Sequence, residues 1–159
     1  MSYTNLTKAI KMASEFEDYF STGGQSLDVM RKAEKLLGVT FSKQISHYIR
    51  EYGYISFSGN EIYGISSDSF EDLNILEGNI VETVLVDRKK YNLPNEWLPI
   101  YFFDDGYYGY LDYSQHNEDG EPPVIMVIYD GEKYVVVEKI AEDLGDFLLG
   151  LVEEQMSNQ

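Results

Sequence analysis

The sequence contains no cysteine and only two histidines, His47 and His116, among its 159 residues. Without cysteine the chain can form neither a disulfide bond nor a thiolate metal site. The two histidines stand far apart in the sequence, so a metal site rich in nitrogen ligands is hard to assemble. We therefore expect no metal site, and a hydrophobic fraction of 43% is large enough to build a core without one.

Long apolar runs are also missing, because nowhere do eighteen apolar residues stand together. The first twenty residues lack the basic start and the apolar stretch of a signal peptide. We therefore expect a soluble, unexported, cytoplasmic protein that does not contact a membrane.

Two kinds of catalytic or cofactor motif are absent. No glycine-rich loop of the G-x-G-x-x-G or G-x-x-x-x-G-K-[ST] form occurs, which excludes the usual nucleotide sites, and we expect no cofactor. No G-x-S-x-G motif occurs either. A catalytic triad would need His47 or His116 beside a serine and a carboxylate, which the sequence neither shows nor forbids.

Basic residues are scarce, with 12 Lys and Arg against 28 Asp and Glu, for a net charge of −16. Residues 1–53 are nearly neutral, whereas residues 54–159 carry five basic and twenty-two acidic side chains. Such a chain repels phosphate backbones, so we expect no direct contact with nucleic acid. The acidic excess indicates either plain solubility or a basic partner, and the sequence does not choose between them.

Apolar residues at helical spacing predict helices at both ends of the chain. The first runs from Leu6 to Phe20 and stops before Gly23, the second lies between a Ser26 cap and Gly38, and the third ends at Gly53. The last spans residues 140–152. Residues 78–91 mix helical and strand periods, and we favour a helix because a basic turn, residues 88–90, suits the negative end of a helix dipole.

Between these helices the pattern is that of strands. A hairpin is expected around Gly59-Asn60, and four further strands follow within residues 97–140, separated by acidic turns that contain glycine. The sequence therefore predicts an α+β fold, in which an antiparallel sheet of about six strands has helices packed on one face or end. We expect one domain, residues 1–159, with its core in about 26–152 and a frayed end at 157–159.

The segment WLPIYFF, residues 97–103, is apolar at every position except the tyrosine. Simple alternation would place Trp97, Pro99, Tyr101 and Phe103 on one face and Leu98, Ile100 and Phe102 on the other. Both faces would then be apolar, which is typical of a central, covered strand. The Asp-Asp-Gly turn and the tyrosines that follow it are expected to be exposed.

Two kinds of chemistry could use the acids around this strand. Asp104, Asp105 and Asp112 surround tyrosines that could stack on a sugar, as in a glycosidase, but solvated turn acids lack the raised pKa of a proton donor. The loops DDG and NEDGE offer oxygen ligands for calcium, but neither matches the twelve-residue calcium loop, and hairpin turns explain them better.

Two groups of residues carry a resemblance to a known family. The first contains Glu34, Leu37, Gly38, Phe41 and Ser42, and closes at Tyr52-Gly53. The second contains Trp97-Leu98-Pro99-Ile100, then Asp104-Asp105-Gly106, then Tyr110-Leu111-Asp112, and is followed by an apolar strand and a closing helix. In these stretches the chain resembles the SUKH superfamily, the bacterial immunity proteins related to fungal Smi/Knr cell-wall regulators. It departs from the family pattern at Phe41-Ser42, where Leu-Pro is usual, and at Tyr107-Tyr108.

The resemblance implies an α+β fold, no enzymatic activity and a protein partner. Many members look like immunity proteins that bind and block a co-encoded polymorphic toxin, often a nuclease. A basic nuclease is the kind of partner that an acidic domain would recognise, because electrostatic complementarity favours its capture. The alternative function is that of an intracellular regulatory or scaffold domain that binds endogenous proteins. A more remote alternative is a small glycan hydrolase. The oligomeric state and the partner's identity stay open. We expect the partner-binding surface to contain these residues: Asp104, Asp105, Tyr107, Tyr108, Asn117, Glu118, Asp119 and Glu121.

Overall fold

A computed structural model describes residues 2–67 and 79–158, and in these residues the chain forms five helices and seven strands. The helices are α1 (Ser2–Ala13), α2 (Leu27–Leu37), α3 (Lys43–Glu51), α4 (Ile80–Tyr91) and α5 (Leu144–Ser157). The strands are β1 (Phe20–Ser21), β2 (Ile55–Phe57), β3 (Asn60–Ile62), β4 (Trp97–Phe102), β5 (Tyr107–Asp112), β6 (Val124–Tyr129) and β7 (Tyr134–Ala141). A 3-10 turn, η1 (Asp104–Gly106), joins β4 to β5. The α+β class is confirmed.

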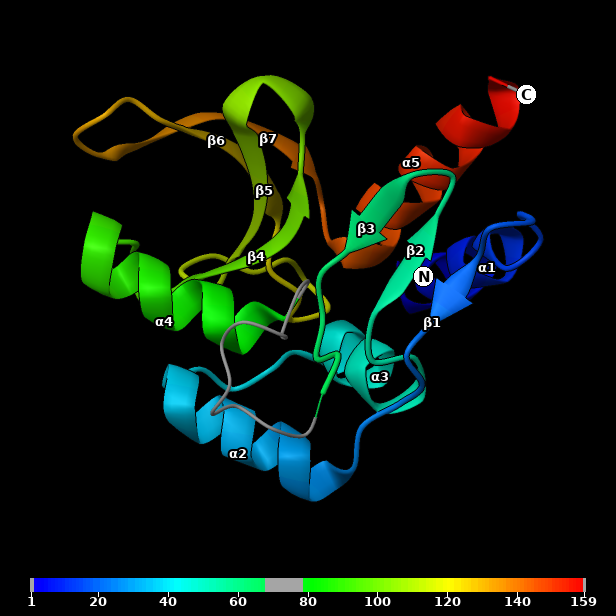
Figure 1. Ribbon diagram of the computed structural model, residues 1–159, viewed down its shortest axis with the longest axis horizontal. Helices are drawn as coiled ribbons and strands as arrows, with labels where there is room; N and C mark the ends of the chain where they lie inside the picture. Colours follow the sequence, from blue (N-terminus) through cyan, green and yellow to red (C-terminus); the bar gives the residue numbers. More distant parts are fainter. Residues whose placement is uncertain (1, 68–78, 159) are drawn as a thin grey trace.

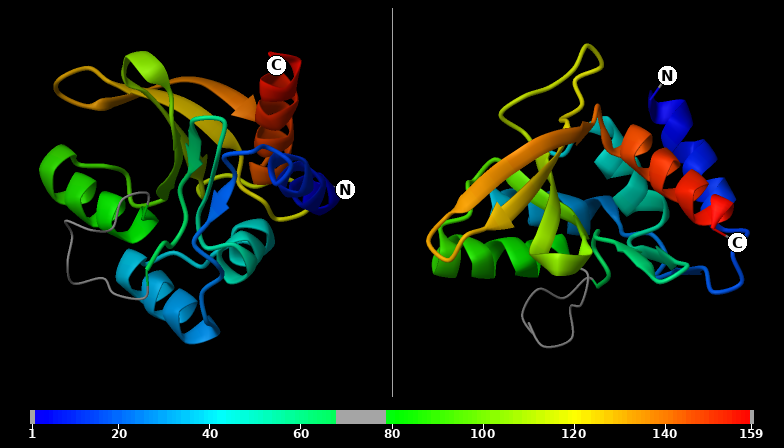
Figure 2. Two further views of the ribbon diagram at one scale, coloured as in Figure 1. Left: turned by 45° about the vertical axis from the view of Figure 1, so that its right-hand side comes forward. Right: turned by 90° about the horizontal axis from the view of Figure 1, so that it is seen from above.

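The strands form two antiparallel sheets in place of the one expected. The larger has the order β4-β5-β6-β7, and the smaller has the order β1-β2-β3. All six expected strands are present, and the seventh, β1, is a two-residue addition. The sheets meet where the Tyr63 N–H donates to the Ile100 carbonyl over 2.9 Å. In Figures 1 and 2, α4 lies against the larger sheet on one side, while α1 and α5 lie side by side on the other.

Helix ends follow the capping signals of the sequence. The Ser26 hydroxyl accepts from the Val29 N–H, and α2 ends at Gly38 in the left-handed conformation. Residues 80–91 are helical, as favoured, because the Asn79 side chain accepts from the Val81 N–H and Asn92 ends the helix with a positive φ. The basic residues 88–90 lie in its last turn. Gly78, the first residue of the predicted segment, lies outside the described residues.

Two predicted helix boundaries are wrong. The first helix ends at Ala13, and Phe20 lies in β1 with 53% of its surface exposed, so the apolar spacing from Leu6 to Phe20 is not one helical face. The last helix starts at Leu144, because the buried Asp143 carboxylate caps it by accepting from the Asp146 N–H. Ile140 therefore belongs to β7, and α5 continues to Ser157, beyond the expected end at residue 152.

The first half of β4 is core, as expected, since Trp97 to Ile100 are all buried. A bulge between Pro99 and Tyr101 then reverses the alternation of side chains. The prediction that Tyr101 and Phe103 lie on the same face as Trp97 is therefore wrong. Tyr101 packs on Phe147 of α5, whereas the Phe102 ring meets Tyr108 at 5.0 Å on the opposite face. β4 is also an edge strand of its sheet, and it is covered because β3 and α4 lie against it.

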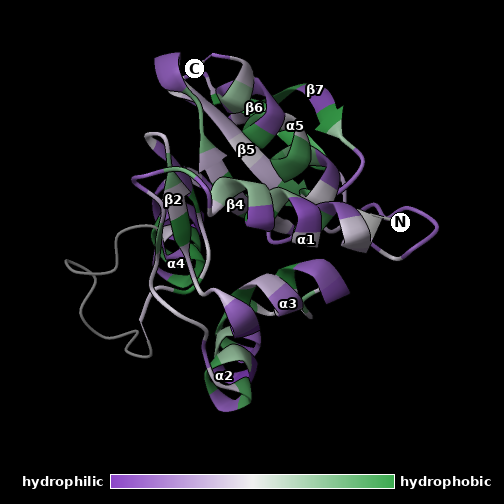
Figure 3. Ribbon diagram, turned by 90° about the vertical axis from the view of Figure 1, so that its right-hand side faces the viewer, coloured by the Kyte–Doolittle hydropathy of each residue, from purple (hydrophilic) through white to green (hydrophobic). Residues whose placement is uncertain are grey.

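Apolar residues from all five helices and both sheets make up the buried cluster. Figure 3 shows hydrophobic and hydrophilic residues alternating along these helices and strands. Tyr48 of α3 lies wholly inside it, where its hydroxyl donates to the Ile62 carbonyl over 2.6 Å and accepts from the Ile55 N–H. Because both groups belong to the β2–β3 hairpin, this hydroxyl fixes the hairpin against α3.

Two family-motif glycines with similar backbone angles differ in their surroundings, which gives a matched test. Gly38 and Gly53 have φ values of 70° and 71°. A methyl group on Gly38 would meet no atom within 4 Å, whereas on Gly53 it would lie 2.2 Å from the Gly23 carbonyl oxygen. We expect Gly38→Ala to lower the free energy of unfolding by about 1 kcal/mol, because alanine is penalised only for the left-handed conformation. Gly53→Ala should cost about 3 kcal/mol or more, because backbone must also move.

Urea unfolding of the two variants measures this difference. Equal losses of stability would show that the close approach of Gly53 to Gly23 does not constrain the fold.

Candidate functional site

The predicted partner-binding residues lie in two places, at the two ends of β5. Asp104 and Asp105 precede this strand and Tyr107-Tyr108 begin it, whereas Asn117 to Glu121 follow its last residue, Asp112. A strand of six residues spans roughly 20 Å. Figure 2 shows the β4–β5 turn and the 113–123 loop on opposite sides of the larger sheet. The structure therefore does not bring the predicted residues into one patch.

At the first end, η1 presents its acids to solvent. Asp104 and Asp105 are exposed, and Asp105 has a left-handed φ of 68°, which aspartate tolerates better than most residues. Tyr107 and Tyr108 are half-buried. Burial raises the pKa of the Tyr108 hydroxyl, and the nearby charge of Asp87 raises it further. The turn is thus accessible, while Tyr108 is partly used in packing.

At the second end, buried polar groups shape the loop of residues 113–123. The Asp112 carboxylate, 5% exposed, accepts from the backbone and hydroxyl of Ser114 and from the Gln115 amide. The Asn117 side-chain oxygen accepts from the N–H groups of Asp119 and Glu121. These bonds fix the loop so that Glu118 and Asp119 stand outward.

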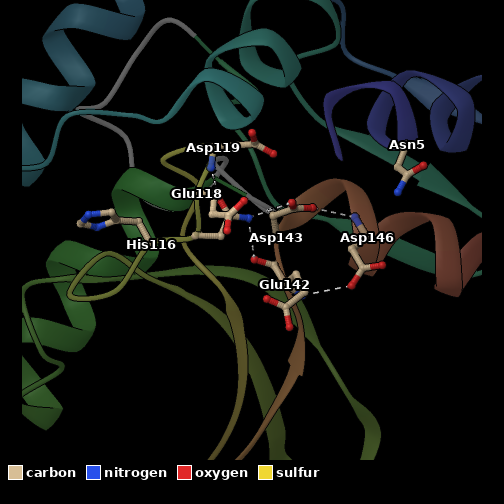
Figure 4. Close-up of a pocket in the computed structure, with 8 residues that line it drawn as sticks. Asn5, His116, Glu118, Asp119, Glu142, Asp143 and Asp146 are labelled. Atoms are coloured by element: carbon tan, nitrogen blue, oxygen red, sulfur yellow. Dashed lines mark hydrogen bonds between the residues drawn. The ribbon is translucent and has the colours of Figure 1, made fainter. Parts of the chain in front are cut away.

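An open groove of about 600 Å³ lies between this loop, the start of α5 and the side of α1. Figure 4 shows carboxylates from two segments converging on it, with Asn5 of α1 at one edge and the His116 ring directed away from the acids. We call this the acidic groove. Its lining residues are Asn5, His116, Asn117, Glu118, Asp119, Glu142, Asp143 and Asp146.

The five acids of the groove have different structural tasks. Asp143 is buried and caps α5, and its other carboxylate oxygen accepts from the Asn117 amide over 3.3 Å. Asp146, in the first turn of α5, accepts from the N–H of Glu142, the residue before the cap, over 3.0 Å. Glu142 is exposed and pairs with Lys139 at 2.7 Å. Glu118, Asp119, Glu142 and Asp146 are all exposed and supply the solvent-facing negative charge. The ion pair between Glu142 and Lys139 is weak because it lies at the surface.

Glu121 is a correction to the prediction, because it is only 3% exposed. Its carboxylate accepts from the Gln44 N–H at the start of α3, over 3.3 and 3.4 Å to its two oxygens. Ser42, which stands at the N-cap position of α3, makes no capping bond with its side chain, and its hydroxyl accepts from the Tyr113 hydroxyl. Glu121 thus caps α3 from the 113–123 loop, and a partner cannot reach this buried side chain.

Sequence reasoning missed Asn5, Glu142, Asp143 and Asp146 as members of the groove. A signal for two of them exists, since Asp-x-x-Asp before an apolar helix is a capping pattern that places both acids at one helix end. Nothing in the sequence indicates that this helix end meets the 113–123 loop.

The enzyme alternatives find little support in the geometry. Asp112 is buried at the opposite end of β5 from Asp104 and Asp105, so these three acids do not share a cleft. His47 is hydrogen-bonded to the Tyr3 hydroxyl at 2.8 Å, away from the groove. Within residues 2–67 and 79–158 no group of three or more acids or histidines is placed to hold a metal ion.

Comparison with known protein families matches residues 28–148 to SUKH_6, the family described as SMI1-KNR4 cell-wall. The chain belongs to this family. The match covers both groups of motif residues, from Glu34 to Gly53 and from Trp97 to Asp112. A search of curated proteins finds no match. In the described part of the chain, no helix is both long and apolar enough to cross a membrane.

The Glu121 cap of α3 gives a pH-dependent prediction. Burial raises the pKa of the Glu121 carboxyl, although hydrogen bonds to its ionised form lower it in part. As pH rises above about 4.3, the unfolded state loses this proton first, so wild-type stability falls until the folded carboxyl ionises too. Glu121→Gln lacks this loss, and its stability relative to wild type should rise between pH 4 and pH 7.

Urea unfolding at both pH values tests this, with Glu118→Gln as the matched control, since that glutamate is exposed on the same loop. If the two variants change alike relative to wild type, burial of Glu121 does not govern its ionisation.

Proposed function

We propose that this protein is a non-enzymatic binding protein that neutralises a basic toxin domain encoded beside it. The observation that carries the proposal is the acidic groove, in which Glu118, Asp119 and Glu142 direct negative charge outward from a fixed frame. Of the described residues that line the groove, none is lysine or arginine. A basic surface would meet an excess of negative charge there.

The charge of the whole chain supports the same partner. A net charge of −16 creates a field that accelerates encounter with a basic protein and disfavours nucleic acid. The acids at the groove are also held in place before binding, by the Asn117 turn and the α5 cap, which lowers the cost of ordering them. An acidic protein that covers a nuclease's basic cleft would compete with its substrate.

Membership of the family supports a protein partner, because SUKH proteins include immunity proteins that bind toxins. The same family includes Smi/Knr-like regulators, so a scaffold role with endogenous partners is the competing function. The gene's neighbourhood distinguishes them, since a toxin-neutralising protein should be encoded next to a large secreted protein with a variable toxic end.

The direct test mixes the purified protein with that toxin domain and measures complex formation by size exclusion and calorimetry at low salt. We expect a complex, and co-expression should rescue growth of cells that produce the toxin. The triple variant Glu118→Gln, Asp119→Asn, Glu142→Gln should weaken binding about tenfold or more at low salt, and less at high salt because ions screen exposed charges.

The matched control removes three exposed acids elsewhere, with Glu15→Gln, Glu17→Gln and Glu132→Gln, so that the net charge changes by the same amount in both triple variants. Asp143 and Asp146 stay unchanged in both variants because they cap α5. Equal weakening by the two triple variants would assign binding to overall charge and remove the groove from the proposal. Absence of any complex, together with failure to rescue growth, would end the toxin-neutralising proposal.

A further inference from the structure

A second cavity, of about 310 Å³, lies at the other end of β5, between the β2–β3 turn and the β4–β5 turn. It combines aromatic residues with two acids, and of the described residues that line it none is basic. Its walls include Tyr63, Tyr101, Phe103, Glu61 and Asp104. We call it the aromatic pocket.

Carboxylates lie close to one aromatic side chain of this pocket, Tyr101. Burial, then the charges of Asp104 and of Glu154 on α5, raise the pKa of Tyr101. Glu61 has one carboxylate oxygen engaged by the Tyr54 hydroxyl. Asp104 is exposed at the mouth. Two carboxylates, those of Glu61 and Asp104, thus line the pocket beside its aromatic residues.

The pocket is held in shape by contacts from two other segments and by contacts between its own walls. The Ser58 N–H donates to the Asp18 carboxylate over 2.8 Å, and the Ser58 hydroxyl donates to the Gln155 side chain of α5. The Tyr101 hydroxyl donates to Asn60, whose amide in turn donates to the carbonyls of Phe57 and Ser58. On the far wall, the rings of Tyr101 and Phe103 pack edge to face at 4.7 Å. The walls therefore do not need to assemble around a ligand.

Aromatic rings beside carboxylates favour one class of ligand. A guanidinium group is planar, always charged and weakly hydrated, so it can stack on an aromatic ring while donating two hydrogen bonds to a carboxylate. An ammonium group is more strongly hydrated and cannot make the same planar contacts. A neutral sugar would leave the acids uncompensated.

We propose that the aromatic pocket binds the guanidinium group of an arginine side chain, with Asp104 and Glu61 as its carboxylate partners and Tyr63, Tyr101 and Phe103 as its aromatic wall. Arginine side chains are frequent anchors of protein interfaces. The inference goes beyond the groove, and it rests on the proposed function only in assigning the arginine to a protein partner. It does not require that partner to be a toxin.

The test titrates the full-length protein with three capped tripeptides, Gly-Arg-Gly, Gly-Lys-Gly and Gly-citrulline-Gly, and follows backbone amide shifts by NMR. Citrulline has the shape of arginine without its charge. We expect the arginine peptide to shift residues 59–63 and 101–104 with a dissociation constant of about 1 mM, as befits one side chain. The lysine peptide should bind at least about threefold more weakly, and the citrulline peptide should cause no shift there.

Asp104→Asn and Glu61→Gln should each weaken arginine binding about fivefold, through loss of one charged hydrogen bond. Asp105→Asn is the matched control, because Asp105 is the neighbouring exposed acid and does not line the pocket. Its left-handed backbone also accepts asparagine. Its dissociation constant should match that of wild type within about twofold.

Three outcomes would overturn the inference: shifts confined to the acidic groove, equal binding of arginine and lysine peptides, or equal weakening by Asp104→Asn and Asp105→Asn. Each is independent of the toxin experiment, since a peptide can fill the aromatic pocket whether or not a toxin binds the groove. Conversely, a toxin complex that still forms when the aromatic pocket is altered by Asp104→Asn or Glu61→Gln would leave the proposed function intact.

Discussion

A chain of three buried polar side chains holds the loop, α3 and α5 in one arrangement, and the acidic groove depends on it. Glu121 reaches out of the 113–123 loop to accept from the Gln44 N–H, and the Gln44 side chain accepts from the Gly145 N–H at the start of α5 over 2.7 Å. Asp143 then joins α5 back to the loop through the Asn117 amide. All three residues are at most 3% exposed. Because buried polar groups are costly without partners, these bonds specify one packing of the three segments.

The same arrangement separates the acids that shape the protein from the acids that can meet a partner. Helix starts attract carboxylates because their N–H groups are unpaired, and Glu121 and Asp143 are both used in this way. Asp146 is exposed and also accepts from the Glu142 N–H, just before the cap of α5. Glu118, Asp119 and Glu142 stand beside them, exposed and oriented by the same backbone. Acidity alone therefore does not identify a binding residue in this chain. Burial and hydrogen bonding decide which of these carboxylates carry charge outward.

The parts of the fold that sequence predicts are those set by neighbouring residues. Ser26 and Gly38 act on α2 alone, and the basic turn at residues 88–90 acts on α4 alone. The local pattern is therefore enough to place both helices. Pro99 and Tyr101 illustrate the limit, since the bulge between them arises from pairing with β5 and reverses which face each later side chain occupies. Glu121 shows the same limit for the site. Its capping partner is 77 residues away, and a string of loop acids gives no sign that one of them points inward.

The separation of the acidic groove from the aromatic pocket has a physical consequence for recognition. They lie at opposite ends of β5, roughly 20 Å apart along a six-residue strand. At 0.1 M salt the screening length is about 10 Å, so the exposed charges at one end contribute little to the potential at the other. A basic surface at the groove and an arginine in the pocket are therefore recognised by independent sets of carboxylates. A partner that engages both must be a folded domain wide enough to span the strand, and its affinity then depends on how rigidly β5 and its neighbours hold the two ends at a fixed distance.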